Sequence, residues 1–291
     1  MIELVVQQTV NGLMMGSIYV LMALGMVLIY GVMHVLNFAH GVLFTLAGYV
    51  CHTVFFQVLG NYPAAILAGI LFLVLVGGGL ERFVFRPLRD NLRNQVMASL
   101  GLILVIQNLI MIVWSPLGLE FKLSTSTTLV PLGSISFSLQ QFIIIGVCAA
   151  VILSLYLFLT RTRLGTALRA TSQNPEAAIV VGIDARRIYT LSFAIGCALA
   201  AIGGALLGPV FLLFPQMGDM PLMKALAAII LGGMGNVWGA AIGGMFIGVV
   251  ESLSTLVIPS DYRDAITYLC IVAVILWKPD GIFGFRVRGE A

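Results

Sequence analysis

Long apolar stretches, separated by short polar ones, run through almost the whole chain. Eight of them approach or exceed the roughly 20 residues that a helix needs to cross about 30 Å of hydrocarbon. They cover residues 8–31, 38–58, 63–82, 96–115, 139–160, 188–213, 238–257 and 263–278. A shorter stretch, 221–233, predicts a ninth and incomplete crossing. Because polar and apolar residues rarely alternate within these stretches, the pattern favours membrane helices over a β-barrel.

The composition supports the same class of protein. The chain is 60% hydrophobic and 9% charged, with a mean hydropathy of +1.08, whereas soluble domains are about 25% charged. We therefore expect an all-α integral membrane protein. Residues 1–291 form a single transmembrane domain, a polytopic bundle of about eight or nine helices, some of them short or broken.

Basic residues are concentrated in three polar regions of the chain. These regions hold twelve of the fifteen Lys and Arg residues: Arg82, Arg86, Arg89 and Arg93; Arg161, Arg163, Arg169, Arg186 and Arg187; Lys278, Arg286 and Arg288. Cytoplasmic loops of membrane proteins carry an excess of Lys and Arg, so we place all three in the cytoplasm. If 221–233 counts as a crossing, the N-terminus is periplasmic and the C-terminus cytoplasmic.

The opposite side receives most of the acidic residues and few basic ones. This group comprises Glu3, Glu120, Asp219, Asp261 and Asp264, with Lys122, Lys224 and Arg263. The loop 116–138, rich in Ser, Thr and Gly, also lies on this side and is β-prone. We expect a periplasmic loop here, either a plain connector or part of an outer docking rim.

Two segments, 21–50 and 222–251, share one pattern. Each runs from a Leu-Met start through an apolar helix into a glycine-rich interruption that contains an asparagine. Paired interruptions mark the substrate pathway in repeat-built transporters, although chance similarity between apolar segments is the alternative. The candidate pathway residues are Asn37, His40 and Gly41 in the first interruption, and Gly235 and Asn236 in the second.

Charged side chains are almost missing from the predicted spans. Glu251 lies towards the outer end of one span and is expected at the external interface rather than on a pathway. His34 and His40 flank the first interruption, where interfacial hydrogen bonding is favoured over a proton relay. The chain has no GxxxxGK[ST] motif to bind and hydrolyse ATP. These observations favour a channel, or a translocation subunit that a partner drives.

The polar segment 161–187 is too long and too patterned for a turn. Leu164, Leu168 and Thr171 follow the spacing of one helix face, with Ala167 on the same face. Asn174 is expected to cap a second short helix that begins at Pro175, with Glu176 near its positive end, and Gly182 is expected to end it. Two such helices, lying along the cytoplasmic surface of the membrane, would form a projection that fits a groove in a partner protein. The alternative is an amphipathic interfacial loop.

Several motifs carry a family resemblance. Glu176-Ala177-Ala178 followed by Gly182 resembles the EAA---G cytoplasmic loop of ABC importer permeases. The surrounding motifs resemble the permeases of high-affinity branched-chain amino acid ABC importers, over essentially the whole chain. They are VLNFAHG (35–41), RPLR (86–89), RLGTALRA (163–170), NPEAAIVVGID (174–184) and ILGGMGNVWGAAIGG (230–244). Because its first span begins at once, the chain looks most like the shorter of the two homologous permeases of that system.

The resemblance implies a function and a set of partners. It implies a non-enzymatic subunit of a bacterial inner-membrane importer, with a second homologous permease, two cytoplasmic ATPases and a periplasmic binding protein. ATP and Mg²⁺ would be bound by the ATPases, and this chain would carry no cofactor and bind no nucleic acid. By the same resemblance, the residues that couple to the ATPases are Arg169, Asn174, Pro175, Glu176, Ala177, Ala178 and Gly182.

Three alternatives remain open. In the first, a permease of the same architecture transports another small solute, such as urea, a short amide or an aromatic acid. A stand-alone channel built from paired half-helices would require Asn-Pro pairs at both interruptions, where this chain has Asn37-Phe38 and Asn236-Val237. An ion-coupled carrier is disfavoured because the predicted spans hold so few charges.

Overall fold

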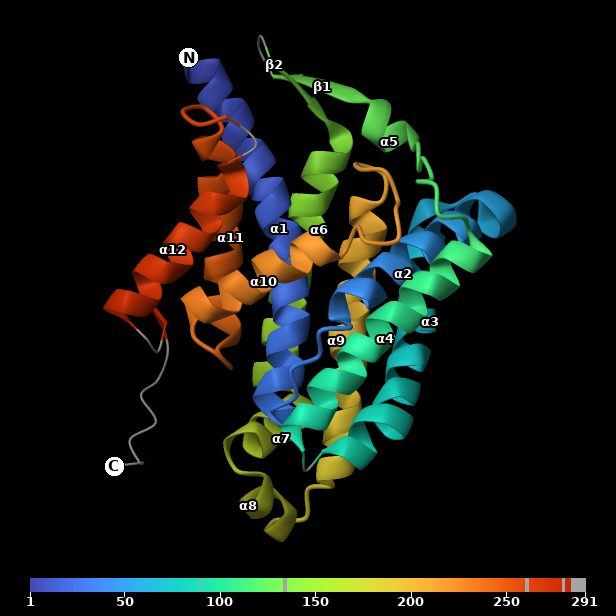
Figure 1. Cartoon of the computed structure of the whole chain (residues 1–291), viewed down its shortest axis with the longest axis vertical. Helices are drawn as coiled ribbons and strands as arrows, with labels where there is room; N and C mark the ends of the chain where they lie inside the picture. The colour runs from blue at the N-terminus through green and yellow to red at the C-terminus, as the bar shows by residue number, and fades with distance from the viewer. Residues whose placement is uncertain (90, 133–134, 260–261, 279–280, 284–291) are drawn as a thin grey trace.

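The computed structural model describes residues 1–89, 91–132, 135–259, 262–278 and 281–283. These residues form a helical bundle with a small hairpin at one end (Figure 1). Seven of the described helices are long and apolar enough to cross a membrane. They are α1 (Ile2–Met33), α2 with its π-helical end η1 (His40–Leu59), α3 with η2 and η3 (Tyr62–Leu88), α4 (Leu92–Val113), α6 (Leu139–Arg161), α9 (Ala185–Leu207) and α11 (Val237–Ser254). The predicted all-α, multi-pass membrane class is confirmed.

Two further predicted crossings form shorter helices. The stretch 221–233 falls in α10 (Asp219–Gly232), which has 14 residues, and 263–278 falls in α12 (Arg263–Trp277), which has 15. The stretch 188–213 is shorter than expected, because α9 ends at Leu207. Pro209, two residues further on, lacks the N–H donor that a continuing helix requires.

Helix α1 forms the centre of the bundle. It packs against α6, α9, α10 and α11, and its residues from Gly16 to Ile29 are all buried. The contact with α11 is very close, since a Cβ on Gly248 would lie 2.3 Å from Cα of Gly16. Small residues let membrane helices approach in this way, and the gain is van der Waals packing. Helix α12 lies at the periphery and contacts α10 and α11.

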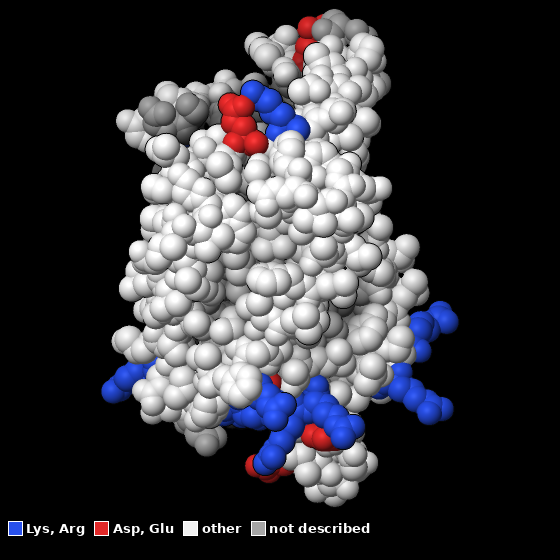
Figure 2. Space-filling view, turned by 90° about the vertical axis from the view of Figure 1, so that its right-hand side faces the viewer, with Lys and Arg blue, Asp and Glu red and all other residues white. Residues whose placement is uncertain are grey.

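The two ends of the bundle differ in charge. On the face seen in Figure 2, a broad band without Lys, Arg, Asp or Glu separates a strongly basic end from a less charged one. We call the end that carries α7 (Arg163–Gln173) and α8 (Pro175–Val180) the basic end. The tail residues Arg286 and Arg288, predicted to join it, lie outside the described residues. Such a band has the pattern expected of a surface that faces lipid.

The loop 116–138 lies at the opposite end and folds as its composition predicts. A helical turn, α5 (Ser124–Thr127), precedes strands β1 (Leu129–Leu132) and β2 (Ile135–Ser138), which pair antiparallel with Leu129 opposite Ser138. Backbone hydrogen bonds between Leu119 and Leu213 join this loop to the turn after α9.

Candidate functional site: the polar segment and its cavity

The polar segment forms the two short helices that its sequence predicts. Asn174 lies between α7 and α8, and its Oδ1 accepts a hydrogen bond from the Ala177 backbone N–H at 2.9 Å. Pro175 occupies the first turn of α8, where its missing N–H costs nothing. Thr162 caps α7 in the same way, through the Gly165 N–H at 3.0 Å. The predicted cap and helix start are therefore confirmed.

The end of α8 exposes an apolar surface. Ala178 packs inward with 3% of its surface exposed, while Ile179, Val180 and Val181 are 58%, 86% and 74% exposed. Figure 1 shows α7 and α8 projecting from the bundle beyond the helices around them. A contiguous apolar patch on a projection outside the membrane band is characteristic of an interaction site.

Gly182 gives the segment its sharp end. Its φ of 87° lies in the left-handed region, and a Cβ there would meet no atom within 4 Å. A side chain at this position is therefore disfavoured by the backbone conformation and not by crowding. The chain then returns to the bundle, where Asp184 caps α9 by accepting hydrogen bonds from the N–H groups of Arg186 and Arg187.

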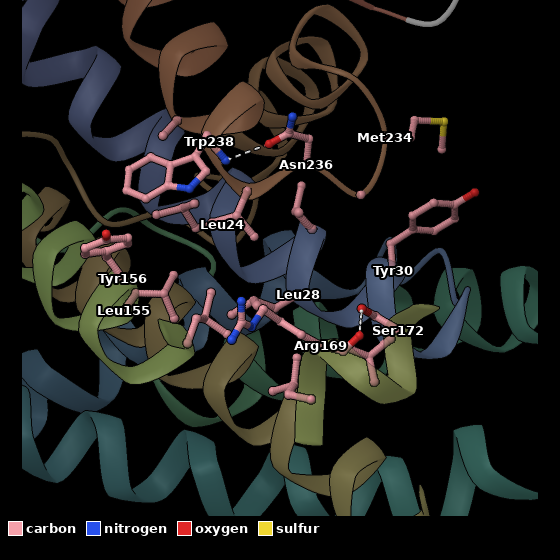
Figure 3. Close-up of a pocket in the computed structure, with 18 of the residues that line it drawn as sticks. Leu24, Leu28, Tyr30, Leu155, Tyr156, Arg169, Ser172, Met234, Asn236 and Trp238 are labelled. Carbon is pink, nitrogen blue, oxygen red and sulfur yellow. Dashed lines mark hydrogen bonds between the residues drawn. The ribbon is translucent and has the colours of Figure 1, made fainter. Parts of the chain in front are cut away.

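Helix α7 also forms one wall of a cavity of about 600 Å³. The other walls come from the end of α1, from α6 and from the interruption between α10 and α11. Figure 3 shows Arg169 reaching this cavity from α7, and Tyr156 and Trp238 on another wall; the rings of these two residues lie 5.3 Å apart. Among the described residues Arg169 has no ion-pair partner. We call this space the larger cavity.

The two glycine-rich interruptions meet beside the larger cavity. Residues 34–39 join α1 to α2, and residues 233–236 join α10 to α11. A Cβ on Gly31, in the last turn of α1 before the first interruption, would lie 3.8 Å from the Gly235 backbone, and His34 lines the cavity together with Gly235. The paired interruptions are thus neighbours in space.

Asn236 lines the larger cavity, but its amide is already engaged. Its Oδ1 accepts from the N–H groups of Trp238 and Gly239, which caps α11, and its Nδ2 donates to the Phe283 carbonyl at 2.9 Å. Ile282 N–H also donates to the Leu231 carbonyl. The segment 281–283 therefore closes over the second interruption.

The candidate residues of the first interruption lie elsewhere. Asn37 is buried in the wall of a second, smaller cavity. His40 and Gly41 line neither of the two described cavities. His40 is fully buried, and neither nitrogen of its imidazole has a hydrogen-bond partner among the described residues; Gly41 packs against Gly218 and Leu222. The interfacial hydrogen bonding expected of His40 is therefore wrong, because the chain at the start of α2 carries its side chain into the bundle core.

Comparison with known proteins identifies the family. A family model described as the branched-chain amino acid transport system permease component matches residues 8–275. The chain belongs to this family. It is similar to the high-affinity branched-chain amino acid transport system permease protein BraD of Pseudomonas aeruginosa, with 32% identity over 96% of this chain and 95% of that protein. The family resemblance read from the motifs is confirmed.

Other relatives extend the comparison. The permease shares 31% identity with LivH of Escherichia coli strain K12, a protein of the same description, over 96% of this chain and 95% of the relative. A probable branched-chain amino acid transport permease protein of Methanocaldococcus jannaschii is 30% identical over 92% of this chain and 89% of its own length. No solved structure is a significant match.

A buried glutamate anchors the arginines of the RPLR motif. Glu81, at the start of η2 (Glu81–Phe85), is fully buried and accepts from Arg86 at 2.7 Å, from Arg89 at 3.3 Å and from the Thr190 hydroxyl at 2.8 Å. The Arg89 guanidinium also lies 3.9 Å from the centre of the Tyr189 ring. The end of α3 is thus joined to the start of α9, directly after the polar segment. The sequence places Glu81 near the cytoplasmic end of a predicted span, but it does not indicate that Glu81 binds these three side chains.

A second buried charge cluster contradicts the sequence-based expectation. Lys224 in α10 is 1% exposed and lies 2.7 Å from Asp264 and 3.4 Å from Glu251. Glu251, 3% exposed, is also 2.8 Å from Arg263. Glu251 therefore faces the bundle and not the external interface. The cluster is neutral overall, which is how charges are accommodated inside membrane proteins.

Proposed function

We propose that the permease is the transmembrane subunit of an ATP-driven ABC importer for branched-chain or related hydrophobic amino acids. The proposal rests on one observation: the two helices of the polar segment face two different surroundings. Its helix α8 exposes an apolar surface outside the bundle, while its helix α7 forms a wall of the larger cavity. A partner that moves α8 therefore changes the shape of that cavity.

The proposed orientation puts the basic end in the cytoplasm and the hairpin loop in the periplasm. The positive charge at the basic end supports it. Two cytoplasmic ATPases, which bind the ATP and Mg²⁺, dock on the segment through α8, a second homologous permease completes the transmembrane pathway, and a periplasmic binding protein delivers the solute. The membrane would be the inner membrane of a bacterial cell.

Movement passes from the ATPase to the solute through contacts already described. The coupling residues are Arg169, Asn174, Pro175, Glu176, Ala177, Ala178 and Gly182. Asn174 caps α8 where it follows α7, and Arg169 lies on the cavity wall that moves. Gly235 and Asn236 form the opposite wall, and Asn37 lines the space next to it. His40 and Gly41 take part through packing around this pathway.

The supported substrate class follows from the relatives and from the lining. Two relatives that match 96% of this chain are described as branched-chain amino acid permeases. The larger cavity is lined mainly by aliphatic and aromatic side chains, and its one cationic side chain among the described residues is Arg169. This lining suits a solute with an apolar side chain and a carboxylate.

Substitution of Gly182 tests the proposal. Gly182→Arg places a side chain on a left-handed residue, which costs about 1–2 kcal/mol and reorients the end of α8. We expect ATP-driven leucine uptake in proteoliposomes of the complete transporter to fall by at least about tenfold, with normal membrane insertion. Gly60→Arg is the matched control. Gly60 also has a positive φ and open surroundings, but it lies in the turn between η1 and α3, outside the polar segment. Normal uptake by Gly182→Arg would contradict the coupling role.

A further inference from the structure

The two helices on either side of the polar segment meet again at the opposite end of the bundle. Helix α6 leads into the segment and α9 follows it, and in Figure 1 both extend between the end with the hairpin and the end with α7 and α8. Helix α1 packs against both of them, whereas α6 and α9 share no extensive contact with each other in the described part of the chain. Their far ends, the first turn of α6 and the last turn of α9, are joined by side-chain hydrogen bonds.

The last turn of α9 leaves two carbonyl groups without a helical partner. In a continuing helix the Ala205 carbonyl would accept from the N–H of residue 209, but Pro209 has none. The Val210 N–H, which would be the helical partner of the Leu206 carbonyl, donates to the Leu207 carbonyl instead. Because a buried carbonyl without a donor is costly, we expect donors from other elements.

Gln140 supplies one of these donors and links four elements, α3, α5, α6 and α9. Its Nε2 donates to the Leu206 carbonyl at 3.1 Å and to the Tyr62 hydroxyl at 3.2 Å, and Tyr62 in turn donates to the Ala205 carbonyl at 3.0 Å. Its Oε1 accepts from the Thr125 hydroxyl at 2.9 Å. Gln140 has no exposed surface, and both N–H donors of its amide are used. It therefore holds elements together and does not contact the solute.

The wall of the larger cavity lies well away from this junction. Helix α6 contributes residues from Ile152 to Thr160 to that wall, and Ile152 is about 18 Å along the helix from Gln140. The polar segment follows at the far end of the same helix. A displacement of the polar segment therefore moves the α6 wall of the cavity about an end that Gln140 holds.

We propose that Gln140 is a positioning residue for transport. It holds α6 and α9 together at the end with the hairpin, while movement of the polar segment separates the two helices at the basic end. The larger cavity then opens towards the basic end, and the opposite end stays closed, so the solute leaves in one direction.

This inference rests on the proposed function, because it requires a partner that moves the polar segment. It goes beyond that function by assigning the fixed end of the helix that moves. The alternative is that the Gln140 hydrogen bonds stabilise the fold and have no role in transport.

The variant Gln140→Met tests the assignment, because it removes all three hydrogen bonds and keeps a flexible side chain of similar length. We expect the amount of leucine taken up per ATP hydrolysed, by the complete transporter in proteoliposomes, to fall by at least about threefold, while ATP hydrolysis persists. This ratio does not depend on how much of the complex is folded, so a purely structural role would leave it unchanged. An unchanged ratio would therefore overturn the proposal, whatever happens to the unfolding temperature.

A second variant decides the test if Gln140→Met does not assemble. Tyr62→Phe keeps Gln140 but leaves the Ala205 carbonyl without its donor, so it should lower the ratio by less than Gln140→Met, and no change would overturn the proposal. Gln57→Met, the same exchange at an exposed position of η1, is the control, and an equal loss there would contradict a specific role for Gln140. A failure of the proposed function is different, since the unmodified complex itself would then show no ATP-dependent uptake.

Discussion

At the residue scale, one asparagine fixes the geometry of the polar segment. The Asn174 amide oxygen satisfies the Ala177 N–H, one of the donors that every helix start leaves without a partner. Its extended backbone turns the chain between α7 and α8. Asn174 is therefore the covalent link between the two helices and also the cap of the second one.

We predict that Asn174→Ala weakens coupling. Loss of the cap costs about 1 kcal/mol, and α8, with only six residues, has little other local stabilisation. ATP-driven uptake should fall severalfold, with faster hydrogen exchange over residues 175–180, and Asn174→Ser should restore both. Asn61→Ala, which removes the corresponding cap of α3 at the opposite end, is the control. Equal loss of uptake in both variants would argue against a specific role for Asn174.

Local chemistry explains which residues could be predicted from the sequence. The Asn174-Pro175 cap and the Gly182 turn depend on neighbours within a few positions, so the sequence predicts them. Asn236 has the same local signature, but its Nδ2 bonds to Phe283, 47 residues away. Its engagement, like the burial of His40, depends on how distant segments pack, and the sequence pattern does not contain that information.

At the scale of elements, buried charges hold the peripheral helix α12. Only Thr267 among its described residues is buried, so apolar packing attaches it weakly. Lys224 of α10 bonds to Asp264 and to the Thr267 hydroxyl, at 2.7 and 3.0 Å, and Arg263 pairs with Glu251 of α11. These contacts join three helices. They escaped prediction because their members lie in three separate stretches of the sequence and become neighbours only when the short helix α10 packs into the bundle.

We predict that Lys224→Met destabilises the permease. Removing one partner of a buried ion pair costs about 3–5 kcal/mol of stability. We expect a loss near the lower value, because Glu251 retains its ion pair with Arg263. Thermal unfolding in detergent should occur at a lower temperature, and α12 should become more accessible to protease. Lys224→Arg, which keeps the charge, should be milder. If Lys224→Met unfolds at the same temperature as the unmodified protein, the ion cluster contributes no net stability.

At the scale of the whole molecule, the charge distribution predicts one orientation. Cys51, Cys148 and Cys197 are buried and Cys270 is partly exposed. In a background of Cys270→Ser, a cysteine at Glu176 should therefore react with an impermeant thiol reagent only from the cytoplasmic side. A cysteine at Lys122, 75% exposed in the hairpin loop, should react only from outside. Intact and inverted membranes distinguish the two cases. Labelling of both positions from the same side would contradict the proposed topology.

At this scale the proposed function requires that ATP hydrolysis by a partner drives the solute through this chain. The direct measurement is leucine uptake into proteoliposomes that contain the permease alone, or the permease with its partner permease, ATPases and binding protein. We expect uptake only in the complete assembly with ATP and Mg²⁺. Uptake by this chain alone, without ATPases, would contradict the proposed function.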